Sequence, residues 1–367
     1  MHIFSQDDAS ARAGAWLTVN LKAIADNYDL VAGLGAGAEC AAVVKADAYG
    51  LGAAQVAQAL AARGAETFFV AHLDEGMTLR ETLPHARIFV LHGFMPDCES
   101  RMQAHGLMPV LNSLDQVRSW KQLCERAGQA LPAALQFDSG MSRFGLSVED
   151  LAERNLFEGL NLQLVMSHLA CADVPDSPAN EMQRQRFVTM AAAFPGVPRS
   201  LAASSGIFLG PDYHFELIRP GAALYGIAPS EGHRVLAPVV SLDARIAQIR
   251  TIQPGDRVGY GLSWTASKPT RIGTLGLGYA DGFFRAQAGQ ASVWHGQTRL
   301  PVIGRVSMDS ISVDLTDAPA DLKAGDVLSV LGPQQDVDAL ARSAGTIGYE
   351  VLTSLGSRFH RVYVPEG

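Results

Sequence analysis

The sequence contains few cysteines and no long apolar run. Its four cysteines, Cys40, Cys98, Cys124 and Cys171, lie far apart, without a Cys-x-x-Cys pair or a matching histidine spacing. We therefore expect neither a metal site nor a disulfide framework. No stretch of about 18 uninterrupted apolar residues could span a bilayer, and the N-terminal MHIFSQDDASARAG lacks a secretion signal. These absences predict a cytoplasmic protein with reduced thiols and no membrane partner.

Charge of one sign is also scarce in any single region. Charged residues make up 18% of the chain, the net charge is −8, and acidic and basic side chains are interspersed. Without a basic stripe, we expect no nucleic-acid partner. The hydrophobic content of 48% over 367 residues allows a large core and more than one domain.

From about residue 15 to residue 225, short apolar runs alternate with longer amphipathic segments, which is typical of βα units around a parallel sheet. The apolar runs are AAVV (41–44), TFFV (67–70), RIFVL (87–91), LMPVL (107–111), AALQF (133–137), LQLVM (162–166), SLAA (200–203) and FELI (215–218). The helix-like segments include 53–62, 73–82, 114–127 and 179–193, with Ser113 and Ser177 placed as N-terminal caps. Eight such strands predict an α/β fold with a closed (β/α)8 barrel of the TIM type. An open doubly wound sheet is the alternative, because the last two runs lie close together.

After about residue 235 the apolar period changes from 3.6 to 2. Alternating runs such as SLDARIAQI and TRIGTLGL are separated by turns at 254–256, 295–296 and 324–326, and one helix-like segment covers 336–345. We therefore predict a barrel domain at 1–235 and a mainly β domain at 236–367.

Polar residues follow several of the predicted barrel strands. In such barrels the catalytic groups lie at the C-terminal ends of the strands, and the loops after strands seven and eight often hold a phosphate. Lys45 ends the first run, where partial burial would favour a neutral amine capable of Schiff-base chemistry. Ser204 and Arg219 follow the last two runs, and a serine hydroxyl can bind a phosphate. Taken singly, each residue also fits an ordinary turn or surface position.

Eight separate motifs together resemble the alanine racemase family, in order and over nearly the whole chain. They are VVKADAYGLG (43–52), DSGMSRFG (138–145), SHLACAD (167–173), RPGAALYG (219–226), VGYG (258–261), GYADG (278–282), GRVSMD (304–309) and IGYEV (347–351). The resemblance implies an isomerase that uses pyridoxal 5'-phosphate to interconvert L-alanine and D-alanine.

The resemblance also implies two bases on opposite faces of the substrate. Lys45 would hold the cofactor and serve as one acid/base, and Tyr260 would be the second. Tyr260 would come from the other subunit of a head-to-tail homodimer, so that the two subunits share each active site. Racemisation needs this arrangement, because a proton leaves one face of the α-carbon and another arrives on the opposite face.

Further roles are implied position by position. The phosphate-binding residues would be Tyr49, Ser204, Gly221, Ala222 and Tyr349. The residues around the cofactor ring and substrate would be Arg219 at the pyridine nitrogen, His168 between Arg219 and Tyr260, Arg143 at the phenolic oxygen, Met308 near the substrate carboxylate and Tyr279 at the entrance. An arginine rarely gives up its proton, so the ring nitrogen is expected to stay unprotonated. Tyr260 must work as a phenolate, and we expect Arg219, acting through His168, to favour that form.

The chain departs from the common family pattern at Gln136, where many members carry a carbamylated lysine that holds the arginine equivalent to Arg143. Glutamine cannot carry a carbamate, and a bound anion such as chloride is one way to restore the missing charge. Ala203 and Ser307 also differ from frequent family residues, although neither change affects the proton-transfer groups.

Several alternative functions remain open at this level. A serine racemase or a racemase of broader range would use the same machinery. A decarboxylase of similar architecture would place an acidic residue at the pyridine nitrogen, where this chain has Arg219. A non-catalytic pyridoxal-phosphate carrier would lack the second domain, and a sugar-phosphate barrel enzyme would not need Lys45. The resemblance points to D-alanine supply for peptidoglycan, with alanine catabolism as the other role.

Overall fold

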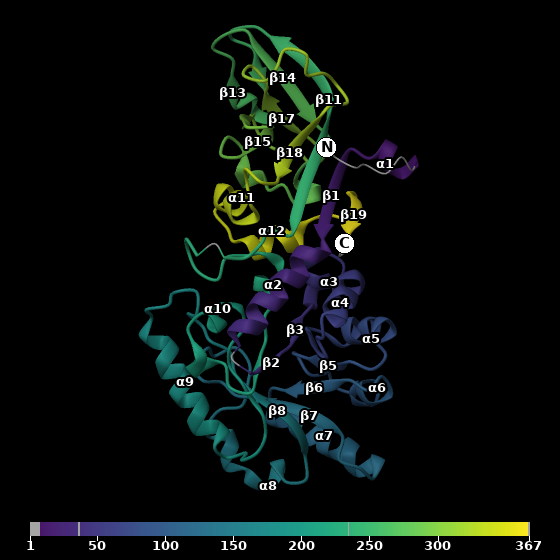
Figure 1. The fold of residues 1–367 in the computed structure, drawn as a ribbon, viewed down its shortest axis with the longest axis vertical. Helices are drawn as coiled ribbons and strands as arrows, with labels where there is room; N and C mark the ends of the chain where they lie inside the picture. Colours follow the sequence, from purple (N-terminus) through teal and green to yellow (C-terminus); the bar gives the residue numbers. More distant parts are fainter. Residues whose placement is uncertain (1–7, 36, 234, 366–367) are drawn as a thin grey trace. The chain divides into compact units, whose positions relative to one another are not determined.

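The computed structural model describes residues 8–35, 37–233 and 235–365. The chain divides into two compact units. One unit is Lys22–Ala237, and the other joins the N-terminal residues up to Leu21 with the residues from Pro238 onward. Figure 1 shows the helices and strands of both units.

The unit Lys22–Ala237 is built around parallel strands. They are β2 (Glu39–Cys40), β3 (Ala42–Val43), β4 (Thr67–Val70), β5 (Arg87–Val90), β6 (Met108–Leu111), β7 (Pro132–Gln136), β8 (Asn161–Met166), β9 (Arg199–Ser200) and β10 (Leu217–Ile218). Strands β3 to β9 form one sheet in sequence order, and β10 pairs with β2. Only Ala41 separates β2 from β3, so these two act as one strand.

Hydrogen bonds close this sheet into a barrel. The N–H of Ala41 donates to the carbonyl of Ile218 (3.0 Å), which joins the eighth strand to the first. The N–H of Glu216 donates to the carbonyl of Arg199 (3.2 Å), and an isolated bridge pairs residues 203 and 219, which joins the eighth strand to the seventh. The (β/α)8 prediction is confirmed, and the open doubly wound alternative is excluded.

The α-helices of this unit are α2 (Leu21–Leu34), α3 (Lys45–Gly50), α4 (Ala53–Ala62), α5 (Leu73–Thr82), α6 (Glu99–Ala104), α7 (Leu114–Ala127), α8 (Arg154–Phe157), α9 (Pro178–Ala191) and α10 (Ser204–Ile207). Helices α4, α5 and α7 coincide with predicted segments, and α9 is shifted by one or two residues from the predicted 179–193. Ser113 caps α7 by accepting the N–H of Gln116, as predicted. Ser177 precedes α9, but its side chain makes no capping hydrogen bond, so this predicted cap is wrong. Its backbone carbonyl accepts the N–H of Asn180 (3.1 Å) instead.

The second unit contains one mainly antiparallel sheet and a small two-stranded pair, β12 (Arg257–Val258) and β13 (Trp264–Thr265). The large sheet runs in the order β14 (Thr270–Leu275), β17 (Ile311–Asp314), β16 (Thr298–Ile303), β15 (Ser292–His295), β18 (Val327–Leu331), β11 (Val240–Ile252), β1 (Ala15–Asn20) and β19 (His360–Val364). An added pairing of β14 with β11 curls the sheet on itself. The predicted helix at 336–345 is α11 (Val337–Ala344), and α12 (Gly348–Ser354) follows it.

Strand β1 corrects the predicted boundary of the first domain. The range 1–235 assigned this strand to the barrel, but Leu17 pairs with Leu242 of β11 on one side and with Arg361 of β19 on the other. Its residues are mostly buried, but its short apolar sequence does not indicate which sheet it joins. The choice depends on β11 and β19, which lie far along the chain.

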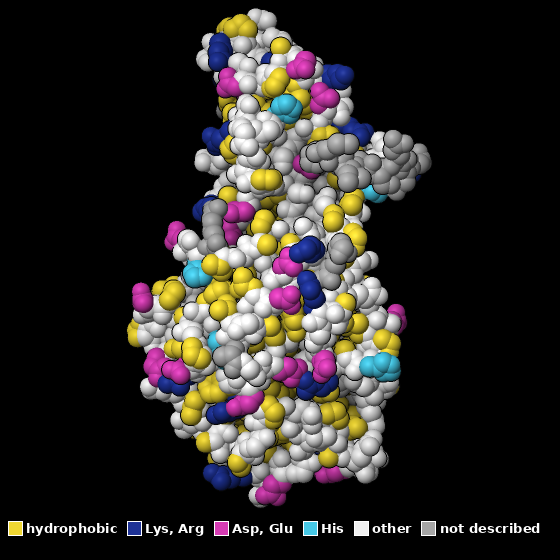
Figure 2. Space-filling model, viewed as in Figure 1, with side chains coloured by type: hydrophobic (Ala, Val, Ile, Leu, Met, Phe, Trp, Pro, Cys, Tyr) yellow, Lys and Arg dark blue, Asp and Glu magenta, His cyan; other side chains and the backbone are white. Residues whose placement is uncertain are grey.

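The described part of the chain contains neither a membrane-spanning helix nor a metal-binding cluster. No helix there is both long and apolar enough to cross a membrane. In the same residues, no group of three or more His, Cys, Asp or Glu side chains is placed to hold a metal ion. On the face that Figure 2 shows, acidic and basic side chains are interspersed.

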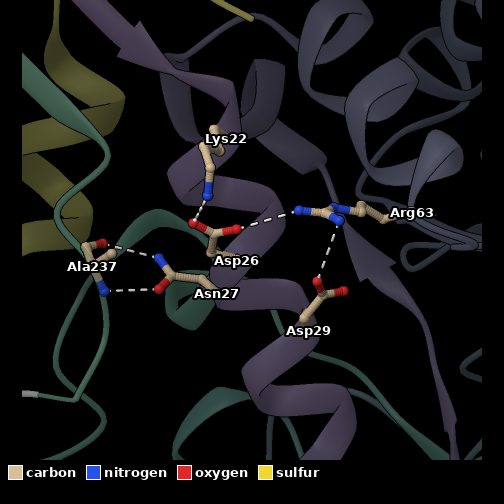
Figure 3. A network of polar contacts seen from close by, with 6 residues as sticks. All are labelled: Lys22, Asp26, Asn27, Asp29, Arg63 and Ala237. Carbon is tan, nitrogen blue, oxygen red and sulfur yellow. Dashed lines mark hydrogen bonds and ion pairs between the residues drawn. The ribbon is translucent and has the colours of Figure 1, made fainter. Parts of the chain in front are cut away.

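Buried Asn27 of α2 holds the C-terminal end of the barrel unit. Its side-chain amide donates to the carbonyl of Ala237 (2.9 Å) and accepts the N–H of the same residue (2.8 Å), and it also donates to the carbonyl of Leu224 (3.2 Å). Figure 3 shows the pair of bonds to Ala237 beside an exposed ion-pair network in which Asp26 contacts Lys22 (2.6 Å). Such exposed pairs add little stability, whereas buried hydrogen bonds are expensive to leave unmade.

We expect Asn27→Leu to lower the free energy of unfolding by about 2–4 kcal/mol, because the backbone groups of Ala237 lose their buried partners. Urea unfolding followed by circular dichroism measures the change. The matched control is Lys22→Ala, which removes only the exposed pair and should change stability by less than about 1 kcal/mol. Equal unfolding midpoints for Asn27→Leu and the unchanged protein would contradict this account.

Candidate active site

Lys45 lies where the first barrel strand ends, separated from β3 only by Val44, and it begins α3. Its side chain is half-buried. Burial lowers the pKa of the Lys45 amine, and the positive charges of Arg143 and Arg219 act in the same direction. The negative charge of Glu75 opposes them. A lowered pKa increases the fraction of neutral amine, the form that acts as a nucleophile and as a base.

Arg219 follows β10 and is buried among the strand ends. Its guanidinium donates to the carbonyl of Ser167 (2.7 Å) and to the hydroxyl of Ser200. Burial lowers the pKa of Arg219 to about 9, which still leaves the group charged at neutral pH. The barrel therefore holds a fixed cation beside the lysine.

His168 follows β8 and is uncharged in this environment. Burial lowers the pKa of His168 to about 3, and the charges of Arg219 and Arg143 contribute to the shift. The loop is held by buried Gln183, whose side-chain amide donates to the carbonyl of His168 (3.2 Å). A neutral imidazole can accept or donate a hydrogen bond but brings no positive charge of its own.

Tyr49, Ser204 and Gly221 lie together and form a polar cradle. The hydroxyl of Ser204 accepts the N–H groups of Gly221 (2.9 Å) and Ala223 (3.1 Å), which leaves its own proton as a donor. A Cβ on Gly221 would lie 2.5 Å from the hydroxyl oxygen of Tyr49, so only glycine permits this approach. Ala222 begins the adjoining 3-10 helix η3 (Ala222–Tyr225). The cradle offers hydroxyl groups of the kind that bind a phosphate.

Tyr225 was not predicted as a site residue, although it lies in the RPGAALYG motif. Its hydroxyl donates to the carbonyl of Val43 (3.0 Å), two residues before Lys45, and its ring packs on that of Tyr49 with centroids 4.6 Å apart. Burial raises the pKa of Tyr225 well above its ordinary value, so it is a neutral donor. Glu75, which contacts the peptide after Lys45, was not predicted as a site residue either.

Arg143 belongs to the exposed loop after β7, which Asp138 organises. The Asp138 carboxylate accepts the N–H groups of Gly140 (2.9 Å), Met141 (2.9 Å) and Ser142 (3.1 Å). Burial alone would raise the pKa of Asp138, but these bonds lower it below its usual value. The carboxylate is therefore ionised and fixes the turn that leads to Arg143. The side chain of Gln136, before this loop, is buried.

The remaining predicted residues lie in the second unit. Tyr260, Met308 and Tyr279 are exposed, with 70%, 52% and 42% of their surface accessible. Their loops adjoin, because the N–H of Tyr279 donates to the carbonyl of Ser307 (3.0 Å) and a Cβ on Gly259 would meet the backbone of Arg305. These three side chains thus belong to one set of neighbouring loops. Tyr349 is half-buried in α12.

The fold and this site define a class: a (β/α)8-barrel enzyme with a half-buried lysine after the first strand, a phosphate-type cradle after the last two, and a separate β domain. Comparisons narrow the class. The model of the alanine racemase N-terminal domain matches residues 19–229, and that of the alanine racemase C-terminal domain matches 239–363. The chain belongs to the alanine racemase family.

Individual relatives agree with this assignment. A protein of Mesorhizobium japonicum named "Alanine racemase, catabolic" is 51% identical over 97% of this chain and 95% of its own length. An alanine racemase of Brucella canis is 45% identical over 98% and 96%. The crystal structure of the alanine racemase of Bartonella henselae, with covalently bound pyridoxal phosphate, superposes with a TM-score of 0.93 at 38% identity, covering 96% of this chain and all of that one. Because the match spans both domains, a single-barrel carrier does not fit.

Proposed function

We propose that this protein interconverts L-alanine and D-alanine with pyridoxal phosphate held by Lys45, and that Lys45 and Tyr260 are the two bases. The observation that carries the proposal is Lys45, whose amine has a lowered pKa and lies near the buried cation of Arg219 in a chain of the alanine racemase family. A lysine amine of this kind is the group that attaches to a cofactor aldehyde.

The residues of the barrel rim fit that cofactor. Tyr49, Ser204 and Gly221 form a cradle suited to its phosphate, with Ala222 beside it, and Tyr349 of the second unit is proposed as a further phosphate ligand. Arg219 would face the pyridine nitrogen. When bound, pyridoxal phosphate supplies a conjugated ring that spreads the negative charge left on the α-carbon.

Proton transfer is the task of this chain's own groups. The amine nitrogen of Lys45 takes a proton from one face of the α-carbon, and the phenolic oxygen of Tyr260 delivers one to the other face; the reverse reaction exchanges these roles. Arg143 would face the phenolic oxygen of the cofactor, the backbone of Met308 would lie near the substrate carboxylate, and Tyr279 would lie at the entrance. His168, being neutral, would connect Arg219 to Tyr260 by hydrogen bonding rather than by its own charge.

We further propose a homodimer in which Tyr260 reaches the Lys45 site of the other subunit. Support comes from the exposed set Tyr260, Tyr279 and Met308, since large side chains gathered on an accessible surface mark an interaction site.

A racemisation assay on the purified protein with added pyridoxal phosphate tests the function. We expect conversion of either alanine enantiomer to the mixture, and an absorbance band at roughly 420 nm from the cofactor bound to an amine. The same assay with L-serine and L-lysine tests substrate range. Turnover of serine equal to that of alanine would replace the alanine assignment, and a colourless protein without racemisation would refute the proposal.

The physiological role has a specific pointer. Two relatives, from Mesorhizobium japonicum (51% identical) and Agrobacterium fabrum (47%), are named as catabolic alanine racemases. We therefore propose alanine catabolism, with D-alanine supply for peptidoglycan as the second candidate. Deletion of the gene separates them: failure to grow on L-alanine or D-alanine as carbon source supports catabolism, and a requirement for D-alanine supports supply.

We expect Gly221→Ala to weaken pyridoxal-phosphate binding by about tenfold or more, because the new Cβ would displace the Tyr49 hydroxyl from the cradle. The contact with Tyr49 is the steric part of this effect, and it does not depend on the left-handed region, because the φ of Gly221 is −129°. Fluorescence titration of the cofactor-free protein measures the affinity. The control Gly33→Ala adds a methyl group at an exposed position of α2 with nothing within 4 Å. Unchanged affinity in Gly221→Ala would remove this cradle from the cofactor site.

A further inference from the structure

The chain that follows Lys45 has an unusual backbone. Residues Ala46, Asp47, Ala48 and Tyr49 all lie in the left-handed region, with φ between 52° and 56°. Each such residue is unfavourable by roughly 1–2 kcal/mol for an L-amino acid with a side chain. Four in succession therefore require contacts from elsewhere to hold them, and these contacts also determine how the Lys45 backbone is oriented.

Glu75 makes one of these contacts. It is the third residue of α5, a helix beside α3 (Figure 1), and its carboxylate oxygen Oε1 accepts the N–H of Ala46 (2.7 Å). The other oxygen, Oε2, accepts the N–H groups of Ala71 (2.7 Å) and His72 (3.1 Å). A glutamate at this helix position ordinarily accepts only the N–H of the capping residue, here His72. Glu75 in addition ties the peptide directly after Lys45 to the loop after β4.

Glu75 also acts on the Lys45 amine through its negative charge. The groups that act electrostatically on the Lys45 amine are Arg143, Arg219 and Glu75, and the amine in turn acts on His92 and His168. Of these, Glu75 is the acidic one.

We propose that Glu75 is a positioning residue for Lys45: its carboxylate fixes the left-handed turn after the lysine and places one negative charge where Arg143 and Arg219 act on the amine. The inference rests on the proposed role of Lys45 as cofactor lysine and first base. An ordinary capping box, by contrast, would affect only the stability of α5.

The first test titrates Lys45 itself in full-length protein freed of cofactor. Acetylation with acetic anhydride at a series of pH values, read by mass spectrometry of the Lys45 peptide against that of exposed Lys22, gives the midpoint. In Glu75→Gln we expect this midpoint at lower pH than in the unchanged protein, because the charge that opposes Arg143 and Arg219 is gone. The matched control is Asp74→Asn, which removes one charge from the same helical turn and should leave the midpoint unchanged. Coincident curves for Glu75→Gln and the unchanged protein would overturn the proposal.

The second test separates geometry from charge. Glu75→Asp keeps the negative charge but draws the carboxylate back by one methylene, so that it cannot bridge both loops. We expect its Lys45 midpoint to stay closer to that of the unchanged protein than the Glu75→Gln midpoint does, while kcat for alanine falls by about tenfold or more, as misplacement of a reacting group predicts. Full kcat in Glu75→Asp would show that the bridge does not position the lysine.

The two tests also separate this inference from the function. Lys45 acetylation needs neither cofactor nor turnover, so its outcome stands even if the unchanged protein fails to racemise alanine. Thermal unfolding of each variant confirms that the comparison is made between folded proteins.

Discussion

Lys45→Ala is expected to abolish racemisation, with a loss of at least about 1,000-fold, the scale on which removal of a catalytic group acts. The variant loses both the attachment point of the cofactor and one of the two bases. Its absorbance band at roughly 420 nm should also disappear. In the unchanged protein, borohydride reduction followed by peptide mapping should leave the cofactor covalently on the Lys45 peptide.

Stability should not explain this loss. Lys45 is half-buried and carries a lowered pKa, so its removal relieves an unfavourable charge and should not unfold the barrel. Lys22→Ala, which removes an exposed amine from the same unit, serves as the control and should keep full activity. If Lys45→Ala racemised alanine at the normal rate, the barrel site would have been assigned wrongly.

Tyr260→Phe is expected to reduce racemisation by about 100- to 10,000-fold, the range of general acid–base catalysis, while cofactor binding persists. Only the phenolic oxygen is lost. Because 70% of Tyr260 is exposed, the free energy of unfolding should change by less than about 0.5 kcal/mol. With Lys45 intact, the α-hydrogen of one alanine enantiomer should still exchange with deuterium from solvent, without conversion to the other enantiomer.

The control for this variant is Tyr363→Phe, which removes a phenolic oxygen from β19 in the same unit and should leave the rate unchanged. Normal rates in both directions for Tyr260→Phe would exclude the two-base assignment. Loss of exchange for both enantiomers would show that Tyr260 also acts on the step assigned to Lys45.

Mixed dimers test whether the site is shared. When Lys45→Ala and Tyr260→Phe subunits are unfolded, combined in equal amounts and refolded, a shared site predicts that about one quarter of the sites regain both bases. If Tyr260 served its own subunit, no mixed dimer would contain a complete site and activity would stay absent. Size-exclusion chromatography establishes the dimer independently.

The protonation state of His168 limits how the phenolate form of Tyr260 can be favoured. Sequence reasoning expected positive charge to reach Tyr260 from Arg219 through His168. With its pKa near 3, His168 is neutral at neutral pH. The positive charge therefore remains on Arg219, and the imidazole of His168 can contribute only hydrogen bonds. Favouring the phenolate therefore depends on fixed cations rather than on histidine protonation.

The sequence alone was enough to predict the longer barrel helices, the barrel and the family. Helices α4 and α5 coincide with the predicted segments 53–62 and 73–82, because the period of apolar residues is a property of neighbours in the chain. Eight alternating units then leave few topologies, since crossovers between parallel strands are right-handed. The ordered motifs identified the family for the same reason: each is a short local pattern.

Only the tertiary structure decided which sheet β1 joins, how the chain turns after Lys45 and which charges surround that amine. The segment Ala46–Tyr49 contains no glycine, and its residues in isolation favour the right-handed helix. Its left-handed path is supported by Glu75, which belongs to another helix. Burial and charge at Lys45, His168 and Arg219 likewise arise from strand ends far apart in the chain. Local periodicity can be read from neighbouring residues, but a pKa or a strained turn depends on groups that meet only after the barrel has closed.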